Sequence, residues 1–413
     1  MRVLVVGGGA REHALAWRLR RDGHAVWAAP GNAGMAADAR LVPVEAADAP
    51  GLLAVCGRES IDLAVIGPEA PLVAGVADRL RAGGTPVLAP GAAAARIEGS
   101  KAWAMGFCRR HGIPAPATSV CATAAEALAH ASSCALPVAV KADGLMAGKG
   151  VVVAADRPAA VAAAEAFAAR GPVVFEEYLA GREVSAFALC DGRRAAFCGL
   201  ARDHKRLLDG DRGPMTGGMG AFSPVPDVDP GAEAAIRAIL DAAVAGMAAE
   251  GAPFVGFLFA GLMLTDRGPR VLEFNCRLGD PEAQALLPLW AGDVAEPCLA
   301  AARGALDPAD APRPMPGAAV GVVLACPGYP EAPAPGQSVP GLDADGRLAV
   351  PPDGALIFHA ATVRRDGWRT AGGRVLTCVG RGPGLAEARR RAYAAAEAVR
   401  FAGARMRADM AAY

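Results

Sequence analysis

The segment VAVKADGLMAGKGVVVA, Val138 to Ala154, decides the fold because it places a glycine-rich loop between two apolar runs. A Walker-type phosphate-binding loop reads GxxxxGK[ST] and runs from a strand into a helix. Here Gly144 and Gly148 are one residue too close together, and Gly150 follows Lys149 where Ser or Thr should hold magnesium. The β-branched valines after the loop predict a strand. We therefore expect a strand–loop–strand unit and exclude a Walker loop.

The composition allows large buried cores, since 53% of the residues are hydrophobic. Its 413 residues suggest roughly two to four domains. With 42 basic and 42 acidic residues the formal net charge is zero, which gives no general electrostatic reason to expect nucleic acid or an anionic membrane as a partner. No apolar run reaches the roughly 18 residues that a membrane-spanning helix needs.

The ten cysteines are dispersed and contain no CxxC pair, which argues against a structural zinc site or a dithiol redox motif. Dispersed cysteines are typical of a reducing compartment. The first residues run directly into a buried-strand pattern and do not have the form of a signal peptide. We therefore expect a cytoplasmic protein.

The first 95 residues alternate strand and helix signals. A strand is predicted first, then a glycine-rich turn and a helix over about residues 11–20, and this order repeats. Such alternation predicts a doubly wound parallel sheet. The predicted strands cover residues 3–6, 25–28, 63–66 and 87–88.

The glycine turn at residues 7–9 does not fit a dinucleotide-binding fingerprint. That fingerprint needs a third glycine where Glu12 stands, and an acidic residue after the second strand, where the chain reads AAPG at 28–31. Two readings stay open: a tight strand-to-helix turn, or a small anion bound at the helix N-terminus. Arg11 and the loop around Asn32 favour the anion.

The rest of the chain divides at loops. Residues 203–224 are too polar and glycine-rich to predict a core element, and a loop of this length in a compact protein is usually functional. Strong strands are predicted at 256–264 and 270–275. The proline-rich stretch 311–317 predicts a linker, after which residues 318–413 alternate strand and helix signals as a last small domain.

A candidate metal site lies on the strand that ends in LEFN. Because side chains alternate along a strand, Glu273 and Asn275 share one face and Phe274 takes the other. Two oxygen ligands suit Mg²⁺, which is often held by one or two side chains together with substrate phosphates. The alternative is a buried Glu273 that pairs with Arg277.

Two further stretches could bind a nucleotide. The strand at 174–179 ends in consecutive acids, and its backbone could pair with an adenine while Glu183 holds ribose hydroxyls; a solvated strand end would look the same. The sequence DHKR at 203–206 could supply cations to phosphates or be an ordinary charged loop. No Ser or Cys nucleophile has a convincing histidine partner, and the six histidines show no metal-ligand spacing.

Taken in order, these stretches resemble the ATP-grasp superfamily, and within it the phosphoribosylamine–glycine ligase family. Each motif is short, but the ordered set covers nearly the whole chain, with GYP, IFHA and GGRVL in the last domain. The motifs before them read GGGAREHALAW, PGNAG, IGPEAPL, EGSKAWA, KADGLMAGKGV, EEYLAGREVS, DHKRLLDGDRGPMTGGMG and LEFNCRLGDPEAQ.

The resemblance implies an α/β and α+β multidomain fold. Residues 1–97 would form an N-terminal substrate-binding domain on a doubly wound parallel sheet. Residues 98–317 would form the ATP-grasp domain of two α+β subdomains, with a flap subdomain at about 119–187. Residues 318–413 would form a small C-terminal α/β domain. The glycine loop would then be a lid over ATP phosphates.

The resemblance also implies a reaction of purine biosynthesis. Glycine and ATP would give a bound glycyl phosphate and ADP, and the amine of 5-phosphoribosylamine would then displace phosphate to form glycinamide ribonucleotide. ATP and Mg²⁺ or Mn²⁺ are the implied cofactors. The implied partners are small-molecule substrates only, with no nucleic acid and no membrane, and the enzyme would be a monomer.

Site residues are carried over from the same motifs, with catalytic roles implied for Arg277, Lys141 and Asp211. Those implied to bind ATP phosphates are Lys101, Lys141, Gly144, Gly148, Lys149 and Gly150. Those implied to hold adenosine are Glu176, Glu177, Leu179 and Glu183. Glu273 and Asn275 would bind metal. Those implied to bind glycine or phosphoribosylamine are Gly9, Arg11, Asn32, Gly67, Glu69, Asp211, Thr216, Arg277 and Asp280.

The chain also departs from the family pattern. Met215 stands where Asn is usual, Arg202 where Gln is usual, Leu278 where Phe is usual and Ala361 where Gly is usual; the tail lacks the usual Asp-Ile-Gly ending. Met215 is the departure that bears most on the substrate. Two alternatives therefore stay open: a carboxylate–amine ligase with another acid or amine, and a nucleotide-binding homologue without turnover.

Overall fold

The computed structural model describes residues 1–146 and 150–412. The N-terminal part is a five-stranded sheet in the order β3-β2-β1-β4-β5, and every pair in it is parallel, as predicted. The order reverses between β1 and β4, so the loops that follow these two strands open into one crevice at their carboxyl ends. The strands are β1 (Arg2–Gly7), β2 (Ala25–Pro30), β3 (Arg40–Leu41), β4 (Leu63–Ile66) and β5 (Val87–Leu88).

Helices cover this sheet, which explains why β4 is buried along its whole length and reads as a continuous apolar run. Helix α1 (Ala10–Arg21) begins directly after the Gly7–Gly9 turn. The other helices up to the next sheet are α2 (Ala49–Glu59), α3 (Glu69–Val73), α4 (Val76–Ala82), α5 (Ala92–Gly99) and α6 (Lys101–Arg110).

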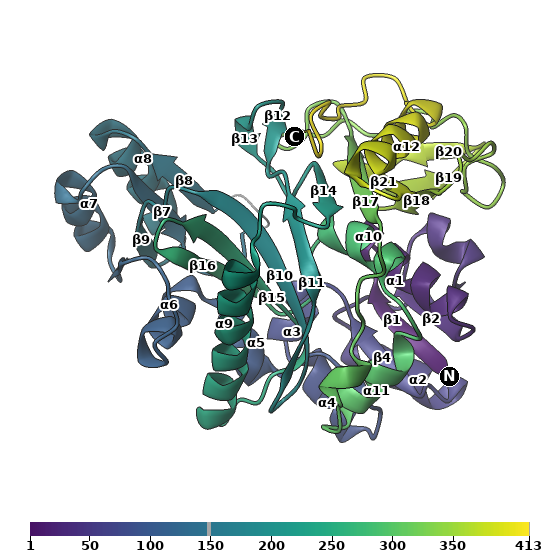
Figure 1. Ribbon diagram of the computed structural model, residues 1–413, viewed down its shortest axis with the longest axis horizontal. Helices are drawn as coiled ribbons and strands as arrows, with labels where there is room; N and C mark the ends of the chain where they lie inside the picture. The colour runs from purple at the N-terminus through teal and green to yellow at the C-terminus, as the bar shows by residue number, and fades with distance from the viewer. Residues whose placement is uncertain (147–149, 413) are drawn as a thin grey trace.

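The quoted segment forms two strands of a four-stranded antiparallel sheet in the order β6-β9-β7-β8. β7 (Val138–Ala142) pairs with β8 (Val151–Ala154), so the glycine loop joins two antiparallel neighbours and the strand–loop–strand prediction is confirmed. β6 (Thr118–Cys121) and β9 (Val173–Glu177) complete the sheet. Helices α7 (Ala124–Ser133) and α8 (Arg157–Ala168) lie beside it in Figure 1.

An eight-stranded antiparallel sheet runs through the rest of the molecule in the order β16-β15-β10-β11-β14-β17-β21-β18. It crosses the predicted linker without a break, because β14 pairs with β17. Its strands are β10 (Arg182–Asp191), β11 (Ala195–Asp203), β14 (Gly220–Ser223), β15 (Val255–Thr265), β16 (Gly268–Asn275), β17 (Ala318–Ala325), β18 (Ala355–His359) and β21 (Arg374–Gly382).

The prediction that residues 203–224 contain no core element was wrong for their last part. Gly220–Ser223 form β14, a fully buried strand in the middle of the large sheet. Four residues after a run of glycines are too few to show a strand period, so only the pairing with β11 and β17 reveals it. The remainder of the loop forms a separate two-stranded hairpin of β12 (Arg206–Leu208) and β13 (Arg212–Met215).

The four-stranded sheet ends at Glu177, whereas β10 from Arg182 belongs to the large sheet. Residues 119–187, predicted as one flap subdomain, are therefore shared between two sheets. The remaining elements are α9 (Pro230–Ala249), α10 (Glu282–Leu286), α11 (Ala295–Ala302), β19 (Thr362–Arg364), β20 (Trp368–Thr370) and α12 (Leu385–Ala398).

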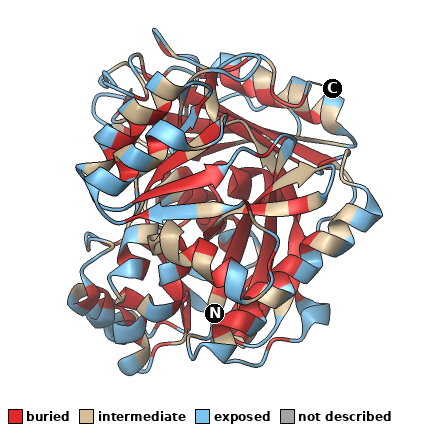
Figure 2. Ribbon diagram, turned by 90° about the vertical axis from the view of Figure 1, so that its left-hand side faces the viewer, coloured by how far each residue is buried: buried red, intermediate tan, exposed pale blue. Residues whose placement is uncertain are grey.

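Burial follows this layered arrangement. In Figure 2 the central strands are red, and the helices outside them show exposed outer sides. Trp290 and Phe187 are among the largest fully buried side chains, and both belong to a core that the N-terminal and central parts share. Within the described residues, no helix combines the length and the apolar character needed to cross a membrane.

Candidate active site

A cleft of about 1370 Å³ collects residues from the N-terminal loops, the four-stranded sheet, the large sheet and the β12–β13 segment. The N-terminal loops contribute Arg11, the four-stranded sheet Lys141, the large sheet Glu273, and the C-terminal part Arg374 and Ala411. Four segments that are distant in the sequence therefore line the same cleft. A cleft of this size exceeds the roughly 300 to 1,000 Å³ of a typical small-molecule pocket.

Lys141 occupies the floor of the cleft in a buried ion pair. Its Nζ lies 2.6 Å from Glu176 Oε2 and donates a 3.1 Å hydrogen bond to the carbonyl of Leu272. Burial raises the pKa of Glu176, although the Lys141 ammonium opposes that rise. Glu176, expected at adenosine, thus serves as the counterion of Lys141. Two of the three ammonium donors are engaged, which leaves one for a ligand.

Lys101 is positioned by the loop of the quoted segment. Ser100 caps α6 and donates to Asp143, and Lys101 Nζ donates to the carbonyl of Gly144 at 2.8 Å. Burial lowers the pKa of Lys101, and the nearby Glu273 carboxylate opposes this. Gly144 has a φ of +92°, which a side chain would strain.

Gly150, at the other end of the same loop, packs against Met146: a Cβ at Gly150 would lie 2.6 Å from Met146 Cβ. The predictions for Gly148 and Lys149 fall outside the described residues.

Glu273 lies among cations. Lys205 Nζ is 3.8 Å from Glu273 Oε1 and 2.8 Å from Glu183 Oε2, so one ammonium bridges two expected site residues. Burial would raise the pKa of Glu273, but Lys205, Lys141 and Lys101 outweigh burial and hold it below the usual value. The carboxylate is therefore kept ionised and faces a region of positive charge.

The alternative pairing of Glu273 with Arg277 is not what the structure forms. Arg277 instead lies 2.9 Å from Glu98 and 3.6 Å from Glu69, and it donates a 3.3 Å hydrogen bond to Asn275 Oδ1. Burial raises the pKa of Glu98 despite the guanidinium beside it. Burial would also raise the pKa of Glu69, but Arg277 and Arg11 outweigh burial and hold that pKa below its usual value.

The donor set at Glu273 and Asn275 fits a phosphate-bound divalent ion. Within residues 1–146 and 150–412 there is no group of three or more His, Cys, Asp or Glu side chains that could hold a metal. A site that offers one carboxylate and one amide oxygen beside lysines needs further oxygens from a ligand. Mg²⁺ is commonly bound in this way, through one or two side chains and substrate phosphates.

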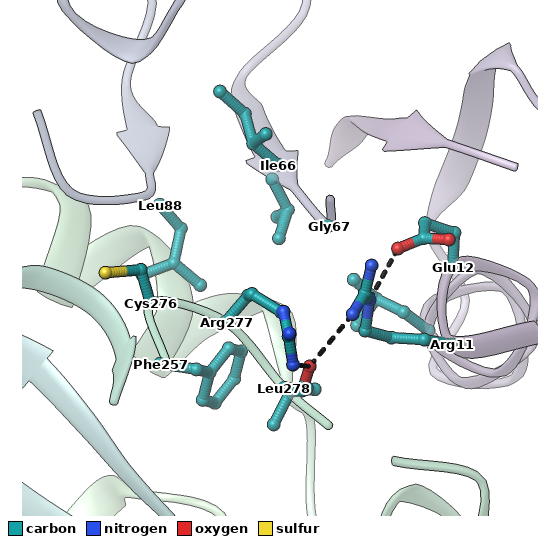
Figure 3. Close-up of a pocket in the computed structure, with 11 residues that line it drawn as sticks. Arg11, Glu12, Ile66, Gly67, Leu88, Phe257, Cys276, Arg277 and Leu278 are labelled. Atoms are coloured by element: carbon teal, nitrogen blue, oxygen red, sulfur yellow. Dashed lines mark hydrogen bonds and ion pairs between the residues drawn. The ribbon is translucent and has the colours of Figure 1, made fainter. Parts of the chain in front are cut away.

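Glu12 organises the N-terminal loops, and sequence reasoning missed it as a site residue. Figure 3 shows it facing Arg11, whose Nε lies 2.6 Å from Glu12 Oε1, while Arg11 also donates to the carbonyl of Leu278. Glu12 Oε2 accepts from the Gly9 N–H at 2.6 Å. A Cβ at Gly67 would lie 2.0 Å from Glu12 Oε1. Glu12 stands three residues after Gly9, the position from which a Glu side chain accepts from the N-cap N–H, and this spacing could have found it.

Asp280 is held from two sides. Its Oδ1 accepts from Gln284 at 2.8 Å and lies 3.5 Å from Arg374 in β21. Burial would raise the pKa of Asp280, but Arg374 and Arg11 keep it below its usual value. Arg374 was quoted only within GGRVL and given no role, because nothing in its own strand points to a partner almost a hundred residues earlier.

Two predicted ligands use their polar atoms inside the protein. Asn32 Nδ2 donates to the carbonyls of Gly8 and His359, and its Oδ1 accepts from Gly34. Thr216 donates to the carbonyl of Lys205 and accepts from the Gly218 N–H. Both side chains shape the loops that they stand on.

The acidic residues at the edge of the cleft also have protein partners. Glu177 pairs with Arg267 at 2.9 Å, and Arg202 donates to the backbone carbonyl of Glu183. Asp211 Oδ1 lies 2.6 Å from Arg407 NH1. Leu179 is buried and lines the cleft.

The chain matches three family models in the order of its domains. Residues 1–98 match the N domain of phosphoribosylglycinamide synthetase, residues 99–283 its ATP-grasp (A) domain, and residues 319–413 its C domain. The structure is also similar to a solved biotin carboxylase–βγ-ATP complex from Campylobacter jejuni, with a TM-score of 0.74 over 98% of this chain and 92% of the other. At 15% identity that likeness shows the fold alone.

Full-length relatives are closer. A phosphoribosylamine–glycine ligase of Caulobacter vibrioides is 46% identical over 99% of this chain and 97% of its own length. Another, from Leifsonia xyli subsp. xyli, is 45% identical, with both chains fully covered. The crystal structure of the phosphoribosylamine–glycine ligase of Thermotoga maritima superposes with a TM-score of 0.86 at 36% identity, covering 99% of this chain and all of the other.

Proposed function

The chain belongs to the phosphoribosylamine–glycine ligase family, and from that premise we propose how its cleft joins glycine to 5-phosphoribosylamine. The products are glycinamide ribonucleotide, ADP and phosphate. The observation that carries the residue-level proposal is a single cleft where Lys141, Glu273 and Arg277 meet the N-terminal loops.

In the first step a carboxylate oxygen of glycine attacks the γ-phosphorus of ATP, and ADP leaves. Arg277 holds the glycine carboxylate and Asp280 its ammonium group. Lys141 and Lys101 lie against the phosphates and offset the negative charge that builds up there. Mg²⁺ or Mn²⁺, held by Glu273 and Asn275, supplies further charge neutralisation at the phosphates when bound. No protein nucleophile is required.

In the second step the amine of phosphoribosylamine attacks the carbonyl carbon of glycyl phosphate, and phosphate leaves. We place this substrate at the N-terminal loops, where Gly9, Arg11 and Glu69 line the cleft. Arg11 is held by Glu12 and by the Leu278 carbonyl, so its position is fixed before the substrate arrives. The four-stranded sheet that carries the glycine loop closes over the site and keeps water from the acyl phosphate.

An ADP-release assay with glycine and freshly made phosphoribosylamine tests this proposal. Sustained ADP release should need both substrates and a divalent cation, and reactions that lack glycine serve as the control. No ADP above background with the complete mixture would overturn it.

Met215 favours testing a second candidate, a ligase for another acid or amine. It lies on β13 and lines the cleft where the family usually has Asn. If the amine is phosphoribosylamine, Met215→Asn should lower its KM by roughly 2- to 12-fold, the effect of one hydrogen bond, and leave the KM for ATP unchanged. A panel in which another amine or amino acid gives faster ADP release would instead support the second candidate.

We further propose that the enzyme acts as a monomer in the cytoplasm. All ten cysteines are free, and nine of them are buried. Free thiols throughout the chain fit a reducing compartment. Sedimentation at working concentration checks the oligomeric state.

A further inference from the structure

The β12–β13 hairpin forms one wall of the cleft without belonging to either large sheet. Arg206, Asp211 and Met215 of this hairpin line the cleft, and so do Ala411 and Ala412 from the C-terminal tail. The hairpin is a two-stranded sheet of its own. Two strands alone are marginally stable in water, so the position of this wall depends on what else holds it. Figure 1 places the hairpin beside the end of the chain.

Arg407 of the tail is the side chain that reaches the hairpin. Its side chain is 1% exposed. Its NH1 donates to Asp211 Oδ1 at 2.6 Å and to the carbonyl of Arg206 at 3.1 Å. Its Nε and NH2 donate to the two oxygens of Asp409 at 2.7 and 2.6 Å. Charge-assisted, bidentate pairs of this kind are the strongest hydrogen bonds that side chains make.

Backbone groups extend this contact on both sides of Arg407. The Ala408 N–H donates to Asp209 Oδ1, and the Gly210 N–H donates to Asp409 Oδ2, each at 2.8 Å. The tail and the hairpin turn are therefore joined by two further hydrogen bonds, one from Ala408 to Asp209 and one from Gly210 to Asp409. A rotation of the hairpin would break several hydrogen bonds together.

The other side of the tail is fixed to helix α12. Arg389 donates to the carbonyls of Ala408 and Met410, and the Tyr393 hydroxyl donates to the carbonyl of Arg407. Met410 is fully buried in the C-terminal core. Arg407 thus connects the C-terminal core to a two-stranded hairpin that belongs to no larger sheet.

The connection leads on into the cleft. Asp211 has a φ of +52° and lies 3.7 Å from His204 Nδ1 through the same oxygen that Arg407 holds. His204 Nε2 is buried and, within the described residues, has no hydrogen-bond partner. Next to His204 stands Lys205, which bridges Glu183 and Glu273.

We propose that Arg407 is a positioning residue for the amine substrate, acting through Asp211. It fixes the hairpin and the Asp211 carboxylate in the cleft wall that phosphoribosylamine contacts. This rests on the proposed function, because it assigns that wall to the amine and the lysine floor to ATP. ATP binding, which uses Lys101 and Lys141 on other elements, should be independent of Arg407.

A double-mutant cycle with Arg407→Gln and Asp211→Asn tests the proposal through ADP release. Each single variant should raise the KM for phosphoribosylamine roughly tenfold, the loss of one charge-assisted hydrogen bond, and change the KM for ATP less than about twofold. The double variant should be worse than either single variant by less than the product of their two effects, because both changes disrupt the Arg407–Asp211 contact. Arg400→Gln, which removes an exposed pair with Glu397, is the matched control and should behave as the parent protein.

Trypsin gives a readout that does not depend on turnover. In Arg407→Gln, trypsin cleavage after Arg212, the first residue of β13, should become several-fold faster, while cleavage at the other sites that remain stays as in the parent. If Arg407→Gln fails to fold, Asp209→Ala, which removes the side-chain acceptor of the Ala408 N–H, takes its place with the same expectations.

Three results would overturn the proposal: an unchanged amine KM in a folded Arg407→Gln protein, losses in the two single variants that add in the double, or an equal rise in the KM for ATP. Failure of the proposed function is a separate outcome, since the parent protein and Arg400→Gln would then release no ADP. The trypsin comparison would still report whether Arg407 holds the hairpin.

Discussion

Replacing Lys141 by methionine should uncover a buried charge. Methionine keeps the length and apolar body of the lysine side chain and removes its ammonium group. Lys141 and Glu176 are 6% and 2% exposed, and their charged atoms are 2.6 Å apart. Glu176 Oε1 already has no hydrogen-bond partner within the described residues. In the variant, Glu176 must either remain a buried carboxylate without a counterion or take up a proton.

The cost of that proton limits the loss of stability. Each pH unit above the unfolded pKa of about 4.5 adds about 1.4 kcal/mol to the cost of protonating the carboxylate. The variant should therefore lose at most about 4 kcal/mol at pH 7.5 and about 1 kcal/mol at pH 5.5, and the first figure agrees with the 3–5 kcal/mol typical of a broken buried pair. The sign follows from linkage: a raised carboxyl pKa favours the folded state below the unfolded pKa and costs stability as pH rises through the folded pKa.

Hydrogen exchange of the β7 and β9 amides, compared between pH 5.5 and 7.5, measures this locally. Lys101→Met is the control: its ammonium donates to the single carbonyl of Gly144, so its loss should cost about 1 kcal/mol at both pH values. If Lys141→Met lowers the local stability by the same amount at both pH values, the reasoning is refuted, since Glu176 would then carry no unpaired charge.

Four other changes have defined outcomes. Glu273→Gln should abolish ADP release and leave the melting temperature nearly unchanged, because Lys205 and Lys141 each keep another carboxylate partner; normal turnover would rule out a metal role for Glu273. Gly34→Ala should lower the free energy of unfolding in urea by about 1–3 kcal/mol, because its Cβ would lie 2.1 Å from the His359 ring. Gly57→Ala in helix α2 has open space around the new Cβ and should raise the free energy of unfolding by about 0.5–1 kcal/mol. Burial and the nearby His13 lower the pKa of His359 from 6.5 to about 3. The neutral ring therefore stabilises the fold above pH 6.5, and this stability is lost as pH falls. His359→Gln should make the urea midpoint depend less on pH between pH 7 and 5.

Much of the fold was predictable because it depends on local patterns. The parallel sheet follows from buried four- to six-residue runs that alternate with helices, and the glycine loop follows from valines on both sides of it. β14 was not predictable, because its four residues read GAFS and follow several glycines, whereas β4, of the same length, is a continuous apolar run. Its position depends on β11 and β17, which lie on either side of it in the sheet.

The candidate site was predictable in its residue types and not in its pairings. Glu273 and Asn275 could be assigned to one face from strand alternation alone. Glu98 could not be recognised as the partner of Arg277, because 179 positions and a change of domain separate them and nothing local marks either residue. The same holds for Arg407 and Asp211. Ion pairs between distant segments are set by the packing of sheets, to which a single sequence gives no direct access.

These pairings bear on how the cleft can select a triphosphate. Lys141 and Lys205 each have a carboxylate partner within the protein, and Glu273 is the acid whose pKa both of them lower. If phosphates bind these ammonium groups, they must compete with Glu176 and Glu183, and only the excess of the new interaction over the old one contributes to affinity. A ligand with several phosphate charges and a divalent cation meets this condition better than a single phosphate, because the cation gives Glu273 a new partner while the phosphates attract the lysines. Selectivity for a metal–triphosphate complex would then arise from charges that are already paired in the protein alone.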